Sequence, residues 1–432
     1  MASSPLSSVA APAGKPAWLI WAGFGVLLLV LPWLFRSSFS ITMLSQMGIA
    51  IVACLSYNIL LGQGGMLSFG HAVYSGLGSY MAIHALNMAA AGSLPVPVSL
   101  IPLVGGVAGL GFAALFGYVT TKKAGTAFAM ITLGMGELVF AMSLMFAEFF
   151  GGEAGVSGNR VIGQPFLGIS FGPGIQVYYL IGVYTFVSVL AMYAFTLTPL
   201  GRILNAVRDN PERVEFIGYD TQRVRYLAFM IAGFFAGIAG GLGAVLFEIV
   251  TAEVVGAGRS GAYLLFTFLG GATFFFGPII GGVLMVLAFM LLSEFTKAWL
   301  LYLGLIFLFM VMYAPGGLAS LIMMNWRVAR FGRLRALLPA YGLLAVTGLL
   351  AFLGAAALIE LVYALQLNAG GDDLLKFAGI ELHARQAGSW FGAAGVAVLG
   401  AAAFEWARRR FARRWDAVQH DIEARLQAAG GR

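Results

Sequence analysis

Long apolar runs separated by short polar segments repeat along most of the chain. The first two, 18–35 ("WLIWAGFGVLLLVLPWLF") and 41–61 ("ITMLSQMGIAIVACLSYNILL"), have the length of a membrane span and contain no charged residue. The pattern predicts an all-α, polytopic transmembrane helical protein with about 10–12 spans, some of them broken or re-entrant. The other predicted spans are 71–90, 98–120, 126–149, 177–197, 225–247, 261–276, 279–296, 299–313, 342–366 and 388–404.

The composition of the chain agrees with a lipid environment. Its 432 residues are 60% hydrophobic and 10% charged, whereas soluble domains are about 45–50% apolar and about 25% charged. The single cysteine, Cys54, lies within an apolar run, which excludes a disulfide framework and argues against a cysteine-based metal site. The net charge of +7 comes from the loops of such a protein, so no nucleic-acid partner is expected.

The distribution of basic residues orients the predicted spans. With the N-terminus placed inside, 19 of the 25 basic residues fall in inside loops, as the positive-inside rule requires. Both termini are then expected in the cytoplasm. The inside set is Lys15, Lys122, Lys123, the arginines of 202–225 and of 327–335, and those from Arg408 onward. The outside set is Arg36, Arg160, Arg259, Lys297, Lys376 and Arg385.

The organisation of the chain changes after a dense block of spans. In the tail that follows, Phe411, Trp415 and Val418 have helical spacing. The tail is interpreted either as a membrane-surface helix or as a solvated end that obeys the positive-inside rule, and its composition favours the solvated end. The predicted parts are the block of spans at 1–325, a basic cytoplasmic linker at 326–341, an additional transmembrane pair at 342–404 and a basic cytoplasmic tail at 405–432.

Two glycine-rich stretches interrupt the apolar runs, at 61–80 ("LGQGGMLSFGHAVYSGLGSY") and 269–282 ("LGGATFFFGPIIGG"). In lipid, a helix break is tolerated only where protein or a water-filled cavity supplies hydrogen bonds to the exposed backbone groups. Breaks at corresponding positions in the two halves of a transporter indicate its substrate path. The alternative is close helix packing through small residues, which is preferred for Gly233, Gly237 and Gly241. The first stretch favours a transport path because it brings polar side chains to membrane depth.

Six polar residues are therefore expected along a substrate pathway. Glu137 is the one carboxylate near the middle of a predicted span, where a charge costs at least about 2.5 kcal/mol, so it must be paired, protonated or cavity-facing. A functional role and a structural hydrogen bond suit its position equally. His71 is expected to be a hydrogen-bonded structural residue, since no histidine or carboxylate beside it has metal-ligand spacing. The six residues are Gln63, Ser68, His71, Tyr74, Ser75 and Glu137.

The sequence lacks the motifs of several soluble enzymes. It contains no G-x-x-x-x-G-K-[ST] phosphate loop, no H-E-x-x-H and no G-x-S-x-G. The string "GAGRSG" (256–261) matches G-x-G-x-x-G but falls in a predicted outside loop, so the match is interpreted as chance. We expect no catalytic residue, metal site or cofactor in this chain, and we predict that it is not an enzyme.

The densest charge lies in the inside segment 198–225, "TPLGRILNAVRDNPERVEFIGYDTQRVR", which holds five arginines and four carboxylates. The positive-inside rule accounts for the arginines but not for the interleaved carboxylates. Asn210 is suited to be the N-cap of a short helix, Pro211 its first residue and Gly218 its stop. This pattern predicts a short exposed helix that contacts a polar partner.

The same segment resembles the cytoplasmic coupling loop of ABC importer permeases. Glu212 and Gly218 have the spacing of the Glu-Ala-Ala-x-x-x-Gly pattern, although Arg213 and Val214 replace its alanines. The wider string is similar to permeases of branched-chain amino acid ABC transporters of the LivM type. The resemblance covers about residues 40–325 and includes "YNILLGQGGMLSFGHAVYSGLGSYMA" (57–82), "LGGATFFFGPIIGGVL" (269–284) and "MYAPGGLASL" (312–321).

This resemblance implies a permease subunit of an ATP-driven importer for branched-chain or related amino acids in the bacterial inner membrane. The implied partners are a second homologous permease, two cytoplasmic ATPase subunits that bind the ATP, a periplasmic or extracellular substrate-binding protein, and membrane lipid. Urea, amides and aromatic acids are alternative substrates in this family. An ion-coupled secondary transporter that uses Glu137 or His71 is the alternative from another class. The residues expected to couple to the ATPases are Arg208, Asp209, Asn210, Pro211, Glu212, Glu215 and Gly218.

Overall fold

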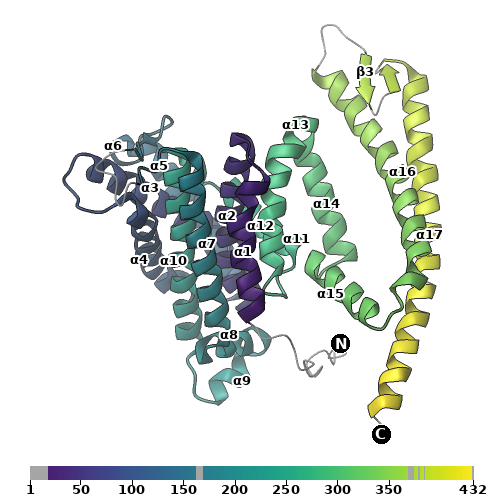
Figure 1. Ribbon diagram of the computed structural model, residues 1–432, viewed down its shortest axis with the longest axis horizontal. Helices are drawn as coiled ribbons and strands as arrows, with labels where there is room; N and C mark the ends of the chain where they lie inside the picture. Colours follow the sequence, from purple (N-terminus) through teal and green to yellow (C-terminus); the bar gives the residue numbers. More distant parts are fainter. Residues whose placement is uncertain (1–17, 162–168, 368–373, 378–379, 384, 431–432) are drawn as a thin grey trace. The chain divides into compact units, whose positions relative to one another are not determined.

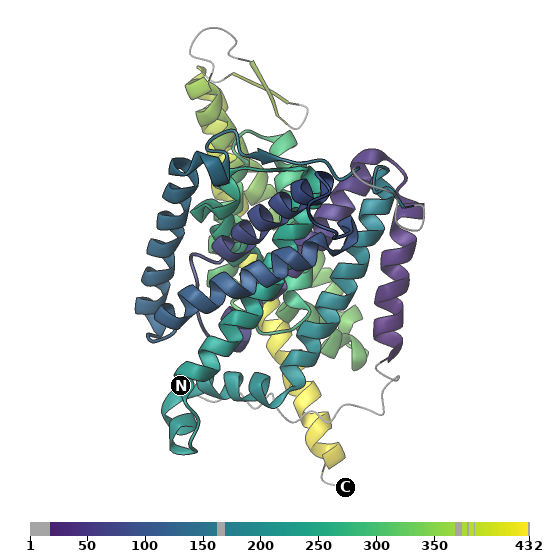
Figure 2. The same cartoon turned by 90° about the vertical axis from the view of Figure 1, so that its left-hand side faces the viewer.

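Two compact units make up the structure (Figures 1 and 2). The computed structural model describes residues 18–161, 169–367, 374–377, 380–383 and 385–430. Lys15 and Arg432, which belong to the predicted inside charges, lie outside the described residues. The first unit comprises Met1–Leu291 and Met310–Ala319, and the second comprises Leu292–Phe309 and Ser320–Arg432.

The described part of the first unit is almost entirely helical. Its two short strands, β1 (Val156–Ser157) and β2 (Ile249–Val250), form an antiparallel pair. Short π-helical turns extend α2 and α12, over Ile59–Gln63 and Ala288–Leu292. The helices are α1 (Trp18–Leu34), α2 (Ser38–Asn58), α3 (Ala72–Ala90), α4 (Ile101–Thr120), α5 (Gly125–Met145), α6 (Ala147–Phe150), α7 (Gly174–Leu197), α8 (Pro199–Asp209), α9 (Pro211–Phe216), α10 (Thr221–Phe247), α11 (Ala257–Gly270) and α12 (Gly277–Leu287).

The second unit contains two long helices, α16 (Leu334–Leu367) and α17 (Ala387–Gly430), which run side by side (Figure 1). The strands β3 (Leu374–Phe377) and β4 (Ile380–His383) form an antiparallel pair in the connection between these helices. The shorter helices of this region are α13 (Ser293–Phe295), α14 (Trp299–Tyr313) and α15 (Gly317–Arg330). The predicted basic linker at 326–341 runs through the end of α15 and the start of α16.

The predicted all-α polytopic class is confirmed. Among the described residues, eight helices are long and apolar enough to cross a membrane, or nine if α14 and α15, which are bent by 49°, form one broken span. Three predicted spans coincide with helices that do not meet this criterion. Of these, α1 and α11 are short, with 17 and 14 residues, whereas α3 is long enough but contains several polar side chains.

Helix α10 lies at the centre of the first unit and packs closely against α4 and α3. A Cβ atom added at Gly237 of α10 would lie 2.2 Å from the carbonyl oxygen of Gly105 in α4. Likewise, a Cβ atom added at Gly109 of α4 would lie 2.3 Å from the carbonyl oxygen of Gly233 in α10. Backbone therefore touches backbone at this crossing, and the predicted packing role of the α10 glycines is confirmed.

The tail and the start of α16 form an apolar cluster in the second unit. Trp415 and Val418 pack against buried Val328 and Leu337. Phe411 contributes a ring contact with Tyr341, at 4.8 Å between ring centroids. The apolar stripe predicted in the tail is therefore present and is covered by protein, on a helix that continues directly from the last predicted span.

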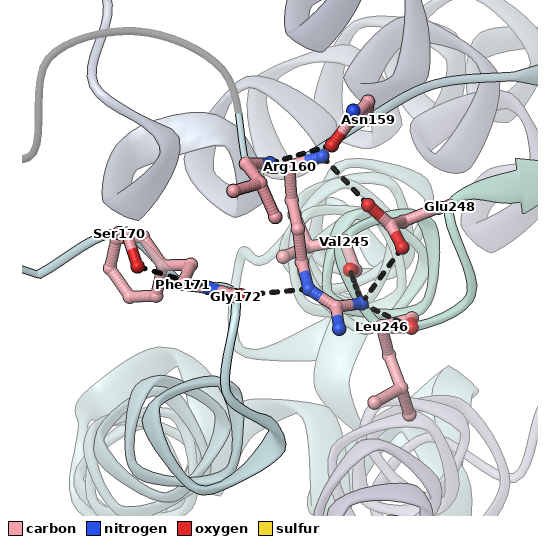
Figure 3. A network of polar contacts seen from close by, with 9 residues as sticks. Asn159, Arg160, Ser170, Phe171, Gly172, Val245, Leu246 and Glu248 are labelled. Atoms are coloured by element: carbon pink, nitrogen blue, oxygen red, sulfur yellow. Dashed lines mark hydrogen bonds and ion pairs between the residues drawn. The ribbon is translucent and has the colours of Figure 1, made fainter.

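A polar network ties the loop after β1 to the C-terminal end of α10 (Figure 3). The guanidinium of Arg160 donates to the carbonyl oxygens of Phe171, Val245 and Leu246 and pairs with Glu248 at 3.3 Å. Glu248 has a φ of 57°, in the left-handed region that non-glycine residues seldom occupy. Since its Nε and Nη1 atoms are engaged, Arg160 has a structural role in holding the loop after β1 against this end of α10.

Candidate functional site

The connection between α7 and α10 contains two capped helices. The Thr198 hydroxyl accepts from the backbone N–H of Gly201 at 3.2 Å and caps α8. The Asn210 side chain accepts from the backbone N–H of Arg213 at 3.0 Å and caps α9. Gly218 follows with a φ of 91°, which favours glycine. The predicted cap, proline start and glycine stop of α9 are confirmed, whereas α8 was not predicted.

Helix α9 presents large apolar side chains at its C-terminal end. Val214 is buried, but Phe216 is 89% exposed and Ile217 is 66% exposed. Helices α8 and α9 lie at the end of the first unit opposite to α6 (Figure 1). Phe216 is not among the expected coupling residues, although a large apolar residue inside a highly charged loop is the signal that would have indicated it. Phe216 and Ile217 together form an exposed apolar patch among charged residues, and such a patch is typical of a surface that a partner protein covers.

Three of the four carboxylates in this segment stabilise local structure. Asp209 pairs with Arg208 at 3.0 Å, and Glu215 accepts from the Thr221 hydroxyl at 2.7 Å. Asp220 caps α10 by accepting from the backbone N–H groups of its first turn. Glu212 is exposed, and no hydrogen bond or ion pair engages it within the described part of the chain. Of the carboxylates, Glu212 is therefore the one left available to an external partner.

Helix α8 also contacts the first glycine-rich break. At the end of α2, the π-helical turn stops at Gln63, and its backbone is not continued as a helix. The Asn205 side-chain amide donates to Gln63 Oε1 at 2.9 Å. The Arg208 guanidinium donates to the carbonyl oxygen of Gly62. Two hydrogen bonds thus connect the capped segment directly to the broken end of a membrane helix.

A buried polar cluster lies beyond this break, where α3 begins. The Ser56 hydroxyl donates to the Ala53 carbonyl at 2.7 Å and lies 3.0 Å from His71 Nε2, so His71 donates through Nε2. Tyr57 Oη donates to the carbonyl oxygen of Ser68 at 2.9 Å. His71 Nδ1 and Ser68 Oγ are buried and have no hydrogen-bond partner within the described residues. The predicted hydrogen-bonded role of His71 is confirmed for one ring nitrogen.

The structure brings some of the six predicted pathway residues together and separates others. Ser68, His71, Tyr74 and Ser75 are buried near the start of α3, and the hydroxyl oxygens of Ser75 and Tyr263 are 3.5 Å apart. Gln63 is engaged with α8 and does not line the cavity that Ser75 lines. Glu137 is exposed on α5 and does not line this cavity either. The pathway role of all six remains a prediction.

Two small adjoining cavities lie between α2, α3, α10, α11 and α12. Ile49, Phe247, Arg259 and Tyr263 line both of them. The predicted outside loop at 256–261 is mostly the first turns of α11, so Arg259 stands on a helix. No group of three potential metal ligands occurs among the described residues.

The described helices form an apolar bundle with glycine-rich breaks, and a capped segment contacts one of these breaks. These features together are typical of a membrane transport permease. The family model described as "Branched-chain amino acid transport system / permease component" matches residues 39–315. The chain therefore belongs to this family and is a multi-pass membrane protein of the ABC transporter permease class.

Curated relatives agree with this assignment. The chain is 27% identical over 318 residues to the high-affinity branched-chain amino acid transport system permease protein LivM of Salmonella typhimurium, covering 68% of this chain and 73% of the relative. LivM of Escherichia coli is also 27% identical, over 320 residues. The fructose import permease protein FrcC of Rhizobium meliloti is 28% identical over 217 residues, covering 48% of this chain and 56% of that protein. No solved structure matches the chain.

Proposed function

We propose that this chain is the permease subunit of an ATP-driven ABC importer for branched-chain or related amino acids in the inner membrane. It forms part of the translocation path, together with a second homologous permease, and it couples to two cytoplasmic ATPase subunits. A substrate-binding protein delivers the amino acid from the other side. Both termini and the α8–α9 segment face the cytoplasm in this proposal, in agreement with the distribution of basic residues.

The contact between α8 and the first helix break is the observation that carries the proposal. Helix α9 offers Phe216 and Glu212 to an ATPase, and α8 connects α9 to the broken end of α2 through Asn205 and Arg208. Movement of the ATPases can therefore reach the membrane helices through hydrogen bonds to Gln63 and Gly62. Rigid-body rocking of the spans would then give alternating access. A secondary transporter has no need of this connection.

Reconstitution tests the proposed function. Proteoliposomes should contain this permease, its second permease and both ATPases, with ATP inside and the loaded binding protein outside. We expect uptake of L-leucine that requires ATP and persists when a protonophore removes the ion gradient. Uptake that survives ATP depletion but stops with the protonophore would identify an ion-coupled transporter instead.

Removing the side chains that connect α8 to the break should uncouple the transporter. In the Asn205→Leu, Arg208→Met double variant, the hydrogen bonds to Gln63 and Gly62 are lost. Because a hydrogen bond involving a charged group contributes about 1.5–3 kcal/mol, we expect leucine uptake per ATP hydrolysed to fall about 10- to 100-fold. Parallel measurements of uptake and phosphate release in the proteoliposomes give this ratio.

Arg202→Met provides a matched control on the same helix. Arg202 is exposed, and no hydrogen bond or ion pair engages its side chain within the described residues. We expect this variant to keep a wild-type ratio of uptake to hydrolysis. If the double variant also keeps that ratio, the proposed connection through α8 is wrong.

A further inference from the structure

The two adjoining cavities, on the predicted outer side of the first unit, share one cationic residue. Arg259 lies in the first turn of α11 and lines both of them, as does Tyr263 one turn later. No other lining residue of either cavity carries a charge. A single positive charge beside a confined space favours an anionic group over a neutral or cationic one.

The guanidinium of Arg259 has no counterion in the described part of the chain. No hydrogen bond or ion pair engages its side chain there, although the residue is half-buried. Arg160, also on the predicted outer side, shows the opposite case, because three carbonyl oxygens and Glu248 engage its guanidinium (Figure 3). Arg160 therefore stabilises the fold, whereas the donors of Arg259 remain available to a ligand.

Hydroxyl groups stand beside this charge in the first cavity. Ser75 and Ser79 line it together with Tyr263. The hydroxyl of Ser75 donates to the Ala72 carbonyl at 3.1 Å, and Ser79 donates to the Ser75 and Gly240 carbonyls. Since the Ser75 proton is engaged, Tyr263 Oη donates to Ser75 Oγ at 3.5 Å, a long hydrogen bond that a ligand oxygen can replace. Arg259 and Tyr263 thus form a paired donor set one helical turn apart.

The second cavity is predominantly apolar. In addition to the residues shared with the first cavity, its lining consists of one polar residue, Gln46, and the apolar residues Ala50, Ala53, Met285, Val286 and Phe289. Neither cavity is lined by a carboxylate. A ligand that combines an anionic end with a branched apolar side chain matches this division between the two cavities.

We propose that Arg259 binds the carboxylate of the transported amino acid, with Tyr263 as a second donor, and that the apolar side chain of the substrate occupies the neighbouring cavity. This inference rests on the proposed function and deepens it, because it assigns a carboxylate-bearing substrate rather than urea or an amide. The guanidinium and a carboxylate form paired charge-assisted hydrogen bonds, which give both affinity and orientation.

Each cavity is large enough for one chemical group of the substrate but not for a whole amino acid. They measure about 50 and about 60 Å³ and are partly open. Each holds a few water molecules and therefore a carboxylate or a small alkyl group, but not a complete amino acid. The substrate consequently enters these spaces only as the helices around them separate during the transport cycle.

Charge removal at Arg259 tests the proposal in the reconstituted complete transporter. We expect Arg259→Gln to lower the rate of L-leucine uptake about 10- to 100-fold, as for the loss of a hydrogen-bonded charge. Arg259→Lys should lie between this variant and the wild type, because lysine keeps the charge but loses the paired geometry. Arg36→Gln removes another predicted outside charge that lines neither cavity, and it should transport at the wild-type rate.

A chemical variant separates charge from folding. Cys54 is the single cysteine and is buried, so a Cys54→Ala, Arg259→Cys protein carries one thiol at the site. After the protein has folded, methanethiosulfonate reagents can attach either a 2-aminoethyl or a 2-sulfonatoethyl group of similar size. We expect the cationic label to give at least 5-fold faster leucine uptake than the anionic label, a lower limit set by about 1 kcal/mol of charge interaction.

The outcomes distinguish this inference from the proposed function. If the wild type takes up leucine with ATP, but Arg259→Gln is within twofold of it or both labels give equal uptake, the carboxylate site is refuted and the proposed function stands. A wild-type complex that takes up urea but no amino acid contradicts the proposed substrate and the carboxylate site together. Loss of leucine uptake with restoration by the cationic label alone supports both.

Discussion

Replacing Phe216 with Asp is expected to abolish ATP-driven uptake while leaving the permease folded in the membrane. Phe216 is 89% exposed at the end of α9, so its replacement removes no internal packing. If an ATPase covers this ring, the variant loses an aromatic anchor, which typically contributes at least about 2 kcal/mol, and gains a buried carboxylate. We therefore expect binding of the ATPases to weaken at least about 30-fold.

Co-purification of the ATPases with the tagged permease measures this effect, and proteoliposome uptake measures its consequence. Phe216→Leu is the matched control, because leucine keeps an apolar side chain at the same position and should retain most of the binding. An unchanged melting temperature for Phe216→Asp in detergent would show that the permease itself remains folded. Normal ATPase binding by Phe216→Asp would contradict the proposed docking role of α9.

Replacing Gly109 with Val should destabilise the first unit strongly. A Cβ atom at this position would lie 2.3 Å from the Gly233 carbonyl oxygen and 2.8 Å from the Gly237 Cα atom. These neighbours are backbone atoms of α10, so no side chain can rotate away, and the two helices must separate. Overpacking of a well-packed core usually costs about 1–3 kcal/mol, and we expect the upper end of this range or more.

Thermal unfolding in detergent, followed by size-exclusion fluorescence, checks this prediction. Each kcal/mol lowers the melting temperature by about 2–4 °C in a unit of this size, so Gly109→Val should melt about 6–12 °C below the wild type. Gly111→Val is the control on the same helix, because no atom lies within 4 Å of a Cβ there. Equal melting temperatures for the two variants would mean that α4 and α10 do not pack through these glycines.

The part of the chain beyond the family match adds structure of its own. The family model ends at residue 315, whereas α16, α17 and the strands between them follow that point. Within this second unit, the Glu360 carboxylate accepts from the hydroxyls of Thr296 and Tyr302. Helix α16, which follows the match, is therefore joined by polar contacts to Tyr302 of α14 and to Thr296 just before that helix.

Local sequence properties determined the class of this protein and the position of the capped helix α9. The length of an apolar run and the side on which arginines gather depend on the solvent, not on which helices become neighbours. For the same reason, the cap at Asn210 and the stop at Gly218 were readable from their residue types. The packing role of the α10 glycines was also visible, because their four-residue spacing places them on one helix face.

Only the tertiary structure decided which polar groups meet. Gln63 lies 142 positions from Asn205 in the sequence, and no local pattern links them. Ser75 and Tyr263 are 188 positions apart. The sequence predicted Arg259 in an outside loop, whereas the structure places it on a helix beside a cavity. Contacts between such distant residues depend on how whole helices cross and on how closely their backbones approach. Those relations arise from long-range packing, so they became visible only once the helices were assembled.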